Sequence, residues 1–154
     1  MLKLNPSEVI QCDFSEVEFI WSTQLWPGRQ SKIEPTSAID HEGDINLNIL
    51  ESKPVFLKIE ENKKIVGVLS GFQTSQRLYR SRGLWVEPAH RRRGLASKLI
   101  AEIERRAVLA KCDTLWTMPR ASAQAFYLQQ GFKIYKAIAK YEFGPHLLVQ
   151  KPIG

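Results

Sequence analysis

VEPAHRRRGLA, residues 86–96, joins a stretch with the pattern of a buried strand to one with the pattern of a helix. The preceding LYRSRGLWV (78–86) ends in apolar and β-branched residues, and the following SKLIAEIERRAVLAK (97–111) repeats apolar residues at helical spacing. Three arginines, Arg91 to Arg93, therefore stand where a helix begins. A helix N-terminus carries partial positive charge and prefers Asp or Glu, so these cations need an explanation.

The same junction lacks a capping residue. The first four N–H groups of a helix have no intrahelical partner, and a Ser, Thr, Asp or Asn side chain usually accepts from one of them. The stretch AHRRRGLA (89–96) contains none of these residues. A bound anion resolves both anomalies, because free N–H groups and arginines converge on its oxygens and Gly94 lets the backbone approach closely. The alternative is a solvated arginine cluster that only keeps the protein soluble.

Strands and helices alternate along the rest of the chain. Hydrophobic periodicity and turn residues predict strands at 8–13, 55–60, 65–74, 77–88, 113–119, 132–143 and 146–153, and helices at 14–26, about 93–110 and 122–130. Residues 27–54 are expected to be loop or weakly helical. This order predicts an α/β (α+β) three-layer sandwich, a mixed sheet with helices on both faces. We expect residues 1–154 to form a single domain.

Composition excludes several classes of protein. A chain of 154 residues with 44% hydrophobic and 25% charged residues is typical of a soluble globular protein. No apolar run approaches the roughly 20 residues that a membrane span needs, and the N-terminus lacks a signal peptide's apolar core. Cys12 and Cys112 form no disulfide or metal pattern, so we expect a cytoplasmic protein. The histidines share no ligand spacing, and no metal is expected.

The net charge of +6 and the pI near 9.4 suit nucleic acid, an acidic membrane surface or an anionic small ligand. No phosphate-binding loop of the G-x-x-x-x-G-K-[ST] type and no dinucleotide motif follows a strand, so Mg²⁺-dependent ATP chemistry has no support. A nucleic-acid-binding domain would rest on the arginine run and the pI alone. We therefore favour a small anionic ligand over nucleic acid, and we expect no membrane partner.

Two motifs resemble those of a known family. VEPAHRRRGLA (86–96) resembles the acetyl-CoA motif of the GNAT family of N-acetyltransferases, whose core is [QR]-x-x-G-x-[GA]. AQAFYLQQGF (123–132) resembles the family's A-x-x-F-Y-x-x-x-G-F. The motifs occur in the family's order, separated by one helix and one strand, and the resemblance covers about residues 55–135.

The resemblance implies a GNAT-like acyl-CoA N-acyltransferase fold, in which strand 78–87 splays from its neighbour 113–118. The pantetheine arm of acetyl-CoA then lies in the gap like an added strand, and its pyrophosphate lies on the amides of residues 92–97. Many relatives carry a pantetheine-contacting Asn where this chain has Arg120, so we expect Arg120 to reach phosphate or substrate instead. The residues implied for acetyl-CoA are Leu84, Trp85, Val86, Arg91, Arg92, Arg93, Gly94, Leu95, Ala96, Ser97 and Arg120.

The implied reaction is direct transfer of the acetyl group from acetyl-CoA to a primary amine. Tyr127 matches the family's frequent general acid, and a phenol with a pKa of about 10 keeps its proton at neutral pH. The alternative for Tyr127 is packing. Some relatives place a Glu in the middle of a strand as general base. Here neither 79–86 nor 113–119, the strands before the two motifs, has an acidic residue at such a position. The acceptor amine would then lose its proton to a water chain or to Glu34, Asp40 or Glu60.

Arg80 and Arg82 project from the same side of their strand. Together with Arg120 and the loop 27–33, they make a cationic acceptor cleft, and our hypothesis is an acceptor with a carboxylate or phosphate near its amine. The alternative is that these arginines cover a sheet edge. Trp26 is expected to wall the acceptor side.

Several alternatives stay open. The acceptor is either a small-molecule amine or the amine of a protein or peptide, and a homodimer is one possible assembly. The absence of an obvious base also leaves open a catalytically idle protein of the same fold that senses acetyl-CoA. The nucleic-acid-binding domain is the third and least favoured reading.

Overall fold

The computed structural model describes residues 8–139 and 146–154. Within these ranges seven strands form one sheet, in the order β1-β2-β3-β4-β5-β7-β6. The strands are β1 (Val9–Cys12), β2 (Val55–Glu61), β3 (Lys64–Gln73), β4 (Leu78–Val86), β5 (Thr114–Thr117), β6 (Lys133–Ile138) and β7 (His146–Pro152). The helices are α1 (Phe14–Ile20), η1 (Trp21–Leu25), η2 (Leu47–Glu51), η3 (Pro88–His90), α2 (Leu95–Leu109), η4 (Ala121–Ala123) and α3 (Gln124–Gln129).

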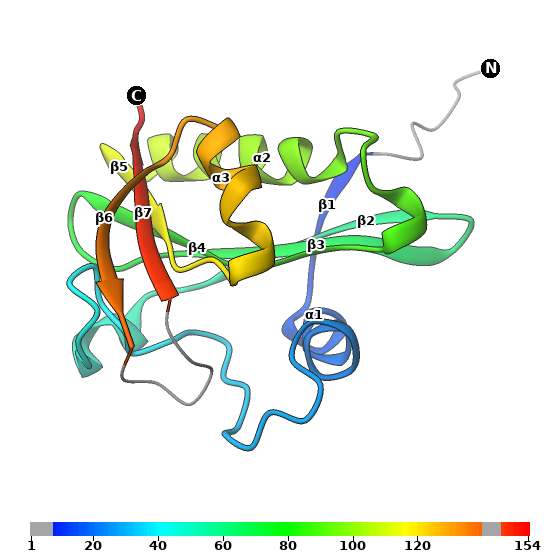
Figure 1. Ribbon diagram of the computed structural model, residues 1–154, viewed down its shortest axis with the longest axis horizontal. Helices are drawn as coiled ribbons and strands as arrows, with labels where there is room; N and C mark the ends of the chain where they lie inside the picture. The colour runs from blue at the N-terminus through cyan, green and yellow to red at the C-terminus, as the bar shows by residue number, and fades with distance from the viewer. Residues whose placement is uncertain (1–7, 140–145) are drawn as a thin grey trace.

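The sheet is the middle of three layers. Figure 1 shows α2 and α3 on one side of it and α1 on the other. Successive side chains of a strand point to opposite faces, so β2 sends Leu57 into the core beneath α2 and Phe56 into the core beneath α1. The three-layer sandwich with a mixed sheet is therefore confirmed.

The two C-terminal strands form the predicted hairpin, but β7 rather than β6 lies next to β5. The pairs β5–β7 and β6–β7 are antiparallel, and β4–β5 is parallel. The predicted strand 132–143 is confirmed only as β6, because residues 140–143 lie outside the described residues. The local pattern predicted both strands and left their order in the sheet undetermined.

A β-bulge interrupts the pairing of β3 with β4. The register passes from the pair Ser70–Arg82 to the pair Val68–Trp85, so residues 83–84 of β4 oppose one residue of β3. The Ser70 Oγ donates to the Arg82 carbonyl at 2.8 Å and fixes the backbone at this point. A bulge bends its strand and increases the local twist, which turns the second half of β4 away from β5.

Strands β4 and β5 diverge as the resemblance implies. Their parallel pairing covers only Leu78 to Arg80 of β4. The next link is a side-chain bond, from the Thr117 Oγ1 to the Ser81 carbonyl at 2.8 Å. From there to the end of β4, no described residue of β5 pairs with the strand, and the gap between the two strands opens.

Gly83 in the bulge is expected to tolerate no side chain. Its φ of +78° is left-handed, and an added Cβ would collide with the Trp21 indole, whose Nε1 donates to the Gly83 carbonyl at 2.8 Å. Gly83→Ala should therefore lower the free energy of unfolding by about 2–4 kcal/mol in denaturant titrations. Gly28→Ala is the control, because Gly28 has φ +76° and no atom within 4 Å of the added Cβ. Equal losses in both variants would contradict a steric cause.

Neither cysteine has the environment of a nucleophile. Both are free thiols, and Cys112 is buried two residues before β5. Burial raises the pKa of Cys112, so its thiol keeps the unreactive protonated form. Within the described ranges, no helix has the length and apolar character to cross a membrane. No group of three or more potential ligand side chains in the same ranges is arranged to hold a metal ion.

Candidate functional site

The arginine-rich loop leads into a helix with an open N-terminus. Helix α2 begins at Leu95, two residues later than predicted, because Arg92 (φ +63°) and Gly94 (φ +79°) have left-handed backbones that a right-handed helix excludes. No side chain caps the helix, and its first bond runs from the Lys98 amide to the Gly94 carbonyl at 3.1 Å. Throughout the described structure, the amides of residues 92–97 have no acceptor. This confirms the uncapped N-terminus.

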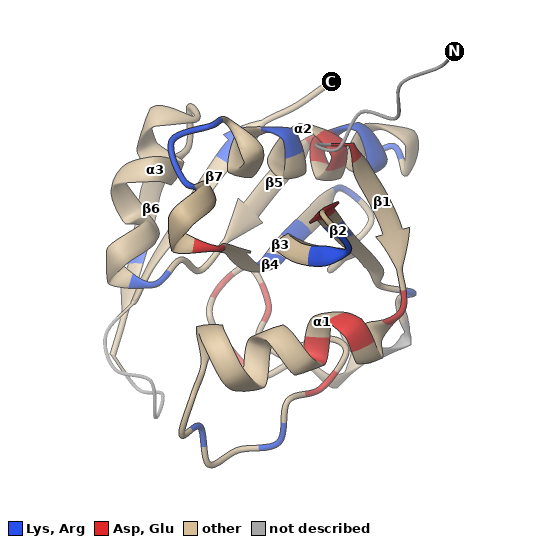
Figure 2. Cartoon of the chain, turned by 90° about the vertical axis from the view of Figure 1, so that its right-hand side faces the viewer, with Lys and Arg blue, Asp and Glu red and all other residues tan. Residues whose placement is uncertain are grey.

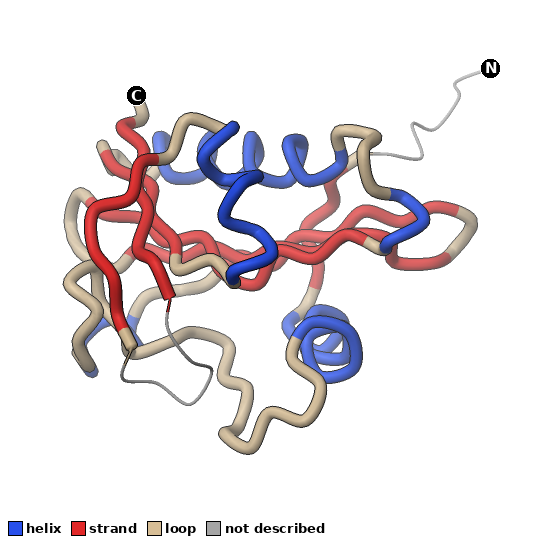
Figure 3. The backbone as a smooth tube through the Cα atoms, in the orientation of Figure 1, coloured by secondary structure: helices blue, strands red, loops and turns tan. Residues whose placement is uncertain are grey.

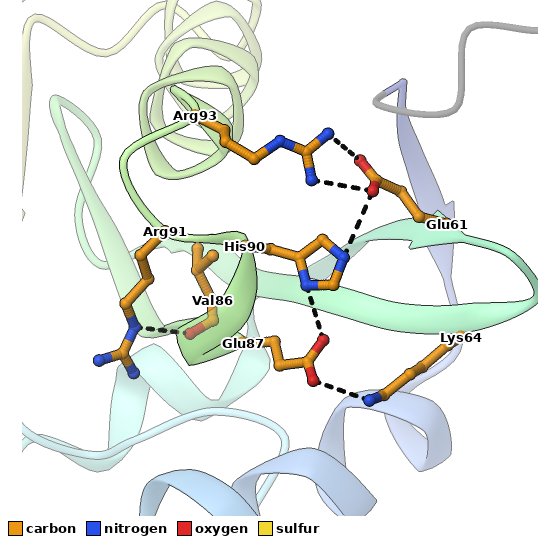
Figure 4. Close-up of polar contacts among 7 residues, drawn as sticks. All are labelled: Glu61, Lys64, Val86, Glu87, His90, Arg91 and Arg93. Carbon is orange, nitrogen blue, oxygen red and sulfur yellow. Dashed lines mark hydrogen bonds and ion pairs between the residues drawn. The ribbon is translucent and has the colours of Figure 1, made fainter.

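Arg91 and Arg93 of the loop have different partners (Figure 4). The Arg91 Nε donates to the Val86 carbonyl at 2.9 Å. Arg93 makes a two-pronged contact with the Glu61 carboxylate at 3.0 and 2.9 Å. Glu61 thus supplies a counter-charge to Arg93. Arg92 is exposed, and a continuous blue stretch marks the arginine run at the start of α2 in Figure 2.

An ionic network ties this loop to the β2–β3 hairpin. The His90 ring lies between two carboxylates, with Nε2 3.4 Å from Glu61 and Nδ1 2.8 Å from Glu87 (Figure 4). The Lys64 Nζ donates to Glu87 at 2.7 Å, and this bond lowers the pKa of Glu87. The loop is thus held in place by protein contacts alone.

The second half of β4 presents its backbone to the gap. Trp85 and Val86 are buried on opposite faces of the sheet, in the α1-side and α2-side cores respectively, while Leu84 lines the gap. At the start of α2, Leu95 is buried and Ser97 is half-buried. The Ser97 Oγ accepts from the Gln130 Nε2 at 3.1 Å, which joins the end of α3 to the start of α2.

Tyr127 lies at the base of the gap. Its side chain is 2% exposed, and its ring packs edge-on against Phe132 at a centroid distance of 5.2 Å. Burial raises the pKa of Tyr127 to about 12, although Ser81 of β4, Thr117 of β5 and the charge of Arg80 act in the opposite direction. The phenol therefore retains its proton across the neutral range.

A cleft of about 840 Å³ extends from Tyr127 to the loop after η1. That loop runs along the α1 side of the sheet, as the tan segment of Figure 3 shows. The described residues that line the cleft are Leu25, Trp26, Pro27, Gly28, Arg29, Gln30, Ser37, Ile39, Arg80, Arg82, Gly83, Leu84, Thr117, Met118, Pro119, Arg120, Ala121, Ala123, Tyr127 and His146. The cleft thus brings together Arg80, Arg82, Trp26, Leu84, Arg120 and Tyr127.

Arg80 and Arg82 are buried in this cleft, with exposed fractions of 3% and 6%. The Arg80 guanidinium lies 5.0 Å from the centroid of the Trp116 ring. The Arg82 guanidinium lies 5.2 Å from that of Trp26, and its Nη1 donates to the Glu34 carbonyl at 2.8 Å. The alternative that these arginines cover a sheet edge is wrong, because both side chains are buried in the cleft rather than spread over the surface.

Arg120 bridges the two walls of the cleft. It stands in the loop after β5, and its Nη1 donates to the Leu25 carbonyl at the end of η1 at 3.1 Å. Burial lowers the pKa of Arg120, and the charge of Arg91 lowers it further. Arg120 therefore lines the cleft and is also close enough to the arginine loop for the charge of Arg91 to act on it. Trp26 lines the cleft as expected, whereas Trp21 is fully buried in the core.

The three candidate bases lie outside the cleft lining. Glu60 pairs with Lys58 on β2 at 2.8 Å. Asp40 accepts from two backbone amides of its own turn at 3.0 Å. The Glu34 side chain is exposed and faces a neighbouring hollow.

The polar residues of the cleft that the sequence argument missed include Thr117 and His146. Thr117 is the last residue of β5, and its contact with Ser81 depends on how two strands pair. His146 begins β7 and reaches the cleft because β7 lies next to β5, an order that no local pattern reveals.

The sequence model of the acetyltransferase (GNAT) family matches residues 19–132. That match spans most of the chain, both motifs and the splayed strands, so the protein belongs to the GNAT acetyltransferase family. No curated protein matches the chain in sequence.

Solved structures share the fold at low identity. An aminoglycoside 6'-N-acetyltransferase in complex with coenzyme A has a TM-score of 0.71 and 12% identity, covering 96% of this chain and 97% of that one. A Klebsiella pneumoniae protein assigned as an acyl-CoA N-acyltransferase has a TM-score of 0.66 and 18% identity, with the same coverage. The PaiA N-acetyltransferase of Thermoplasma acidophilum, in complex with coenzyme A, has a TM-score of 0.57 and 14% identity, covering 64% and 60%.

Proposed function

We propose that the protein is an acetyl-CoA-dependent N-acetyltransferase that acetylates the primary amine of a small molecule. The observation that carries this proposal is the gap between β4 and β5, with an uncapped helix beside it and a buried phenol at its base. We further propose that residues 1–154 form one such domain, because a single sheet extends through the described residues.

The residues at the gap fit acetyl-CoA. The free amides of residues 92–97, with Arg91 and Arg92, would hold the pyrophosphate, and Gly94 leaves room for close approach. The backbone of residues 84–86 would pair with the pantetheine amides, because β5 does not occupy that edge. Arg120 would contact the pantetheine arm at the end that faces the acceptor. When bound, acetyl-CoA supplies an activated thioester.

Tyr127 would serve as the general acid. The acceptor nitrogen attacks the acetyl carbon, a C–N bond forms and the C–S bond breaks. The departing sulfur takes the Tyr127 proton, the excess proton on the nitrogen leaves to solvent, and the Tyr127 phenolate regains a proton from solvent. The raised pKa of Tyr127 keeps the phenol protonated for this step.

The cleft itself would favour the neutral amine that the attack requires. Nearby cations disfavour an ammonium ion and lower its pKa. Arg80 and Arg82 in the cleft supply such cations, so the absence of a carboxylate among the described lining residues is compatible with catalysis. That same absence supports the second candidate, a protein that binds acetyl-CoA without transferring the acetyl group.

Thermal denaturation with acetyl-CoA tests the binding. A ligand at 100 times its Kd adds about 2.7 kcal/mol of stability, so the Tm should rise by several degrees. S-Acetylpantetheine, which has the thioester and lacks the pyrophosphate, should raise the Tm much less. Release of free thiol in the presence of amines then separates the transferase from the binding protein. An unchanged Tm with acetyl-CoA would overturn both candidates.

A further inference from the structure

Four arginines line the cleft, namely Arg29, Arg80, Arg82 and Arg120. No Asp or Glu belongs to the lining, as far as the described residues extend. The arginine run of residues 91–93 is not part of the lining, and of the four lining arginines Arg120 is the one on which the charge of Arg91 acts. Charge of one sign therefore gathers where the acceptor would bind.

Two of the four guanidinium groups are more than nine-tenths buried. A buried charge has a large desolvation cost, and like charges two residues apart on one face of a strand repel each other. Burial holds the pKa of Arg82 well below its usual range, and Arg80 and Arg29 depress it further. The exposed Glu34 carboxylate belongs to the lining of a neighbouring hollow. It raises the pKa of Arg82, but this is the smallest of the influences on that pKa.

The contacts of Arg82 are neutral and orient it without supplying a counter-charge. The Glu34 carbonyl holds its Nη1 at 2.8 Å. The rings of Trp21 and Trp26 lie 4.9 and 5.2 Å from its guanidinium carbon. A fixed guanidinium presents its remaining N–H groups in the planar geometry that carboxylate and phosphate oxygens match.

The loop arginine extends this arrangement. The Arg29 guanidinium also lies over the Trp26 ring, at 5.0 Å, and its Nε donates to the Ser31 Oγ at 2.8 Å. Arg29 and Arg82 thus both pack on the Trp26 indole, and the charge of Arg29 acts on Arg82.

We propose that the acceptor is a small amine that carries a carboxylate or phosphate, which binds at Arg82 and Arg29 while the amino group points toward Tyr127. This inference rests on the proposed function and specifies its substrate class. The same charges repel polycations such as polyamines and aminoglycosides. We therefore expect this chain to differ in acceptor from its aminoglycoside-acetylating structural neighbours.

Initial rates with matched amines test the inference. O-Phosphoethanolamine is compared with ethanolamine for phosphate, and β-alanine and phenylalanine with their amides for carboxylate. Spermidine and kanamycin represent polycations. At low ionic strength, kcat/KM should be at least about tenfold higher for one anionic member than for its neutral match, and lowest for the polycations. The pair with the larger ratio identifies the anion.

Arg29→Gln gives the matched variant, because Arg29 stands in a loop where the change should not impair folding. It should lower the anionic-to-neutral ratio of kcat/KM by about threefold or more. Arg77→Gln removes the same charge from an exposed site outside the cleft and should leave the ratio unchanged. A fall in both variants would show a general effect of net charge and overturn the inference.

Equal rates for anionic and neutral members, or faster reaction of the polycations, would also overturn the inference and leave acetyl transfer intact. Turnover of none of the amines, with acetyl-CoA still bound, would instead overturn the proposed function. In that case calorimetry of O-phosphoethanolamine and ethanolamine binding to the CoA-loaded protein decides the inference by the same comparison.

Discussion

Tyr127→Phe is expected to lower kcat by about 10²-fold or more, since loss of a general acid typically costs 10²–10⁴-fold. Phenylalanine fills the same space against Phe132, so the fold and the affinity for acetyl-CoA should be retained. The departing sulfur then takes its proton from water. Steady-state kinetics, together with the acetyl-CoA affinity from calorimetry, measures both quantities.

Tyr79→Phe provides the matched control. Tyr79 is also on the α2 side of the sheet, is 4% exposed, and has its pKa raised to about 12 by burial, but it does not line the cleft. Its replacement should leave kcat unchanged. If both variants lost activity equally, the effect would reflect disturbed packing, and if neither did, Tyr127 would have no part in proton transfer.

Gly94→Val is expected to abolish binding of acetyl-CoA. The residue has φ +79°, which a β-branched side chain adopts only with strain, and its Cβ would enter the open space in front of the free amides. That space is where the pyrophosphate is proposed to lie. The stabilisation by acetyl-CoA in thermal denaturation should therefore disappear.

Gly28→Val separates this effect from backbone strain. Gly28 has a similar φ of +76° and equally open surroundings, but it belongs to the loop after η1. Both variants should lose comparable stability, of about 1–3 kcal/mol, without ligand. Only Gly94→Val should lose the response to acetyl-CoA. An undiminished response in Gly94→Val would contradict the proposed pyrophosphate site.

Local chemistry was sufficient to predict much of the fold. The helical repeat after Gly94 and the absence of a cap before it predicted a helix with free amides, because both properties depend on neighbouring residues. The two left-handed residues that delay the helix to Leu95 were not apparent, since an arginine rarely adopts that backbone.

Long-range features were less accessible. The bulge at Gly83 depends on the Trp21 ring beneath it, and the position of β7 depends on pairing with β5. The burial of Arg80 and Arg82 was also hidden, because charged residues usually lie at the surface, and the indole rings and the Glu34 carbonyl that contact these two come from distant parts of the chain. The sequence thus predicted several residues of the cleft, but it did not predict the tertiary contacts that hold their side chains in place.

A crystal structure of the protein with coenzyme A tests the central claim most directly. The account predicts pyrophosphate oxygens within about 2.7–3.2 Å of the amide nitrogens of residues 92–97, with the pantetheine arm between β4 and β5. Amides left free at the start of α2, with the coenzyme bound elsewhere, would contradict it.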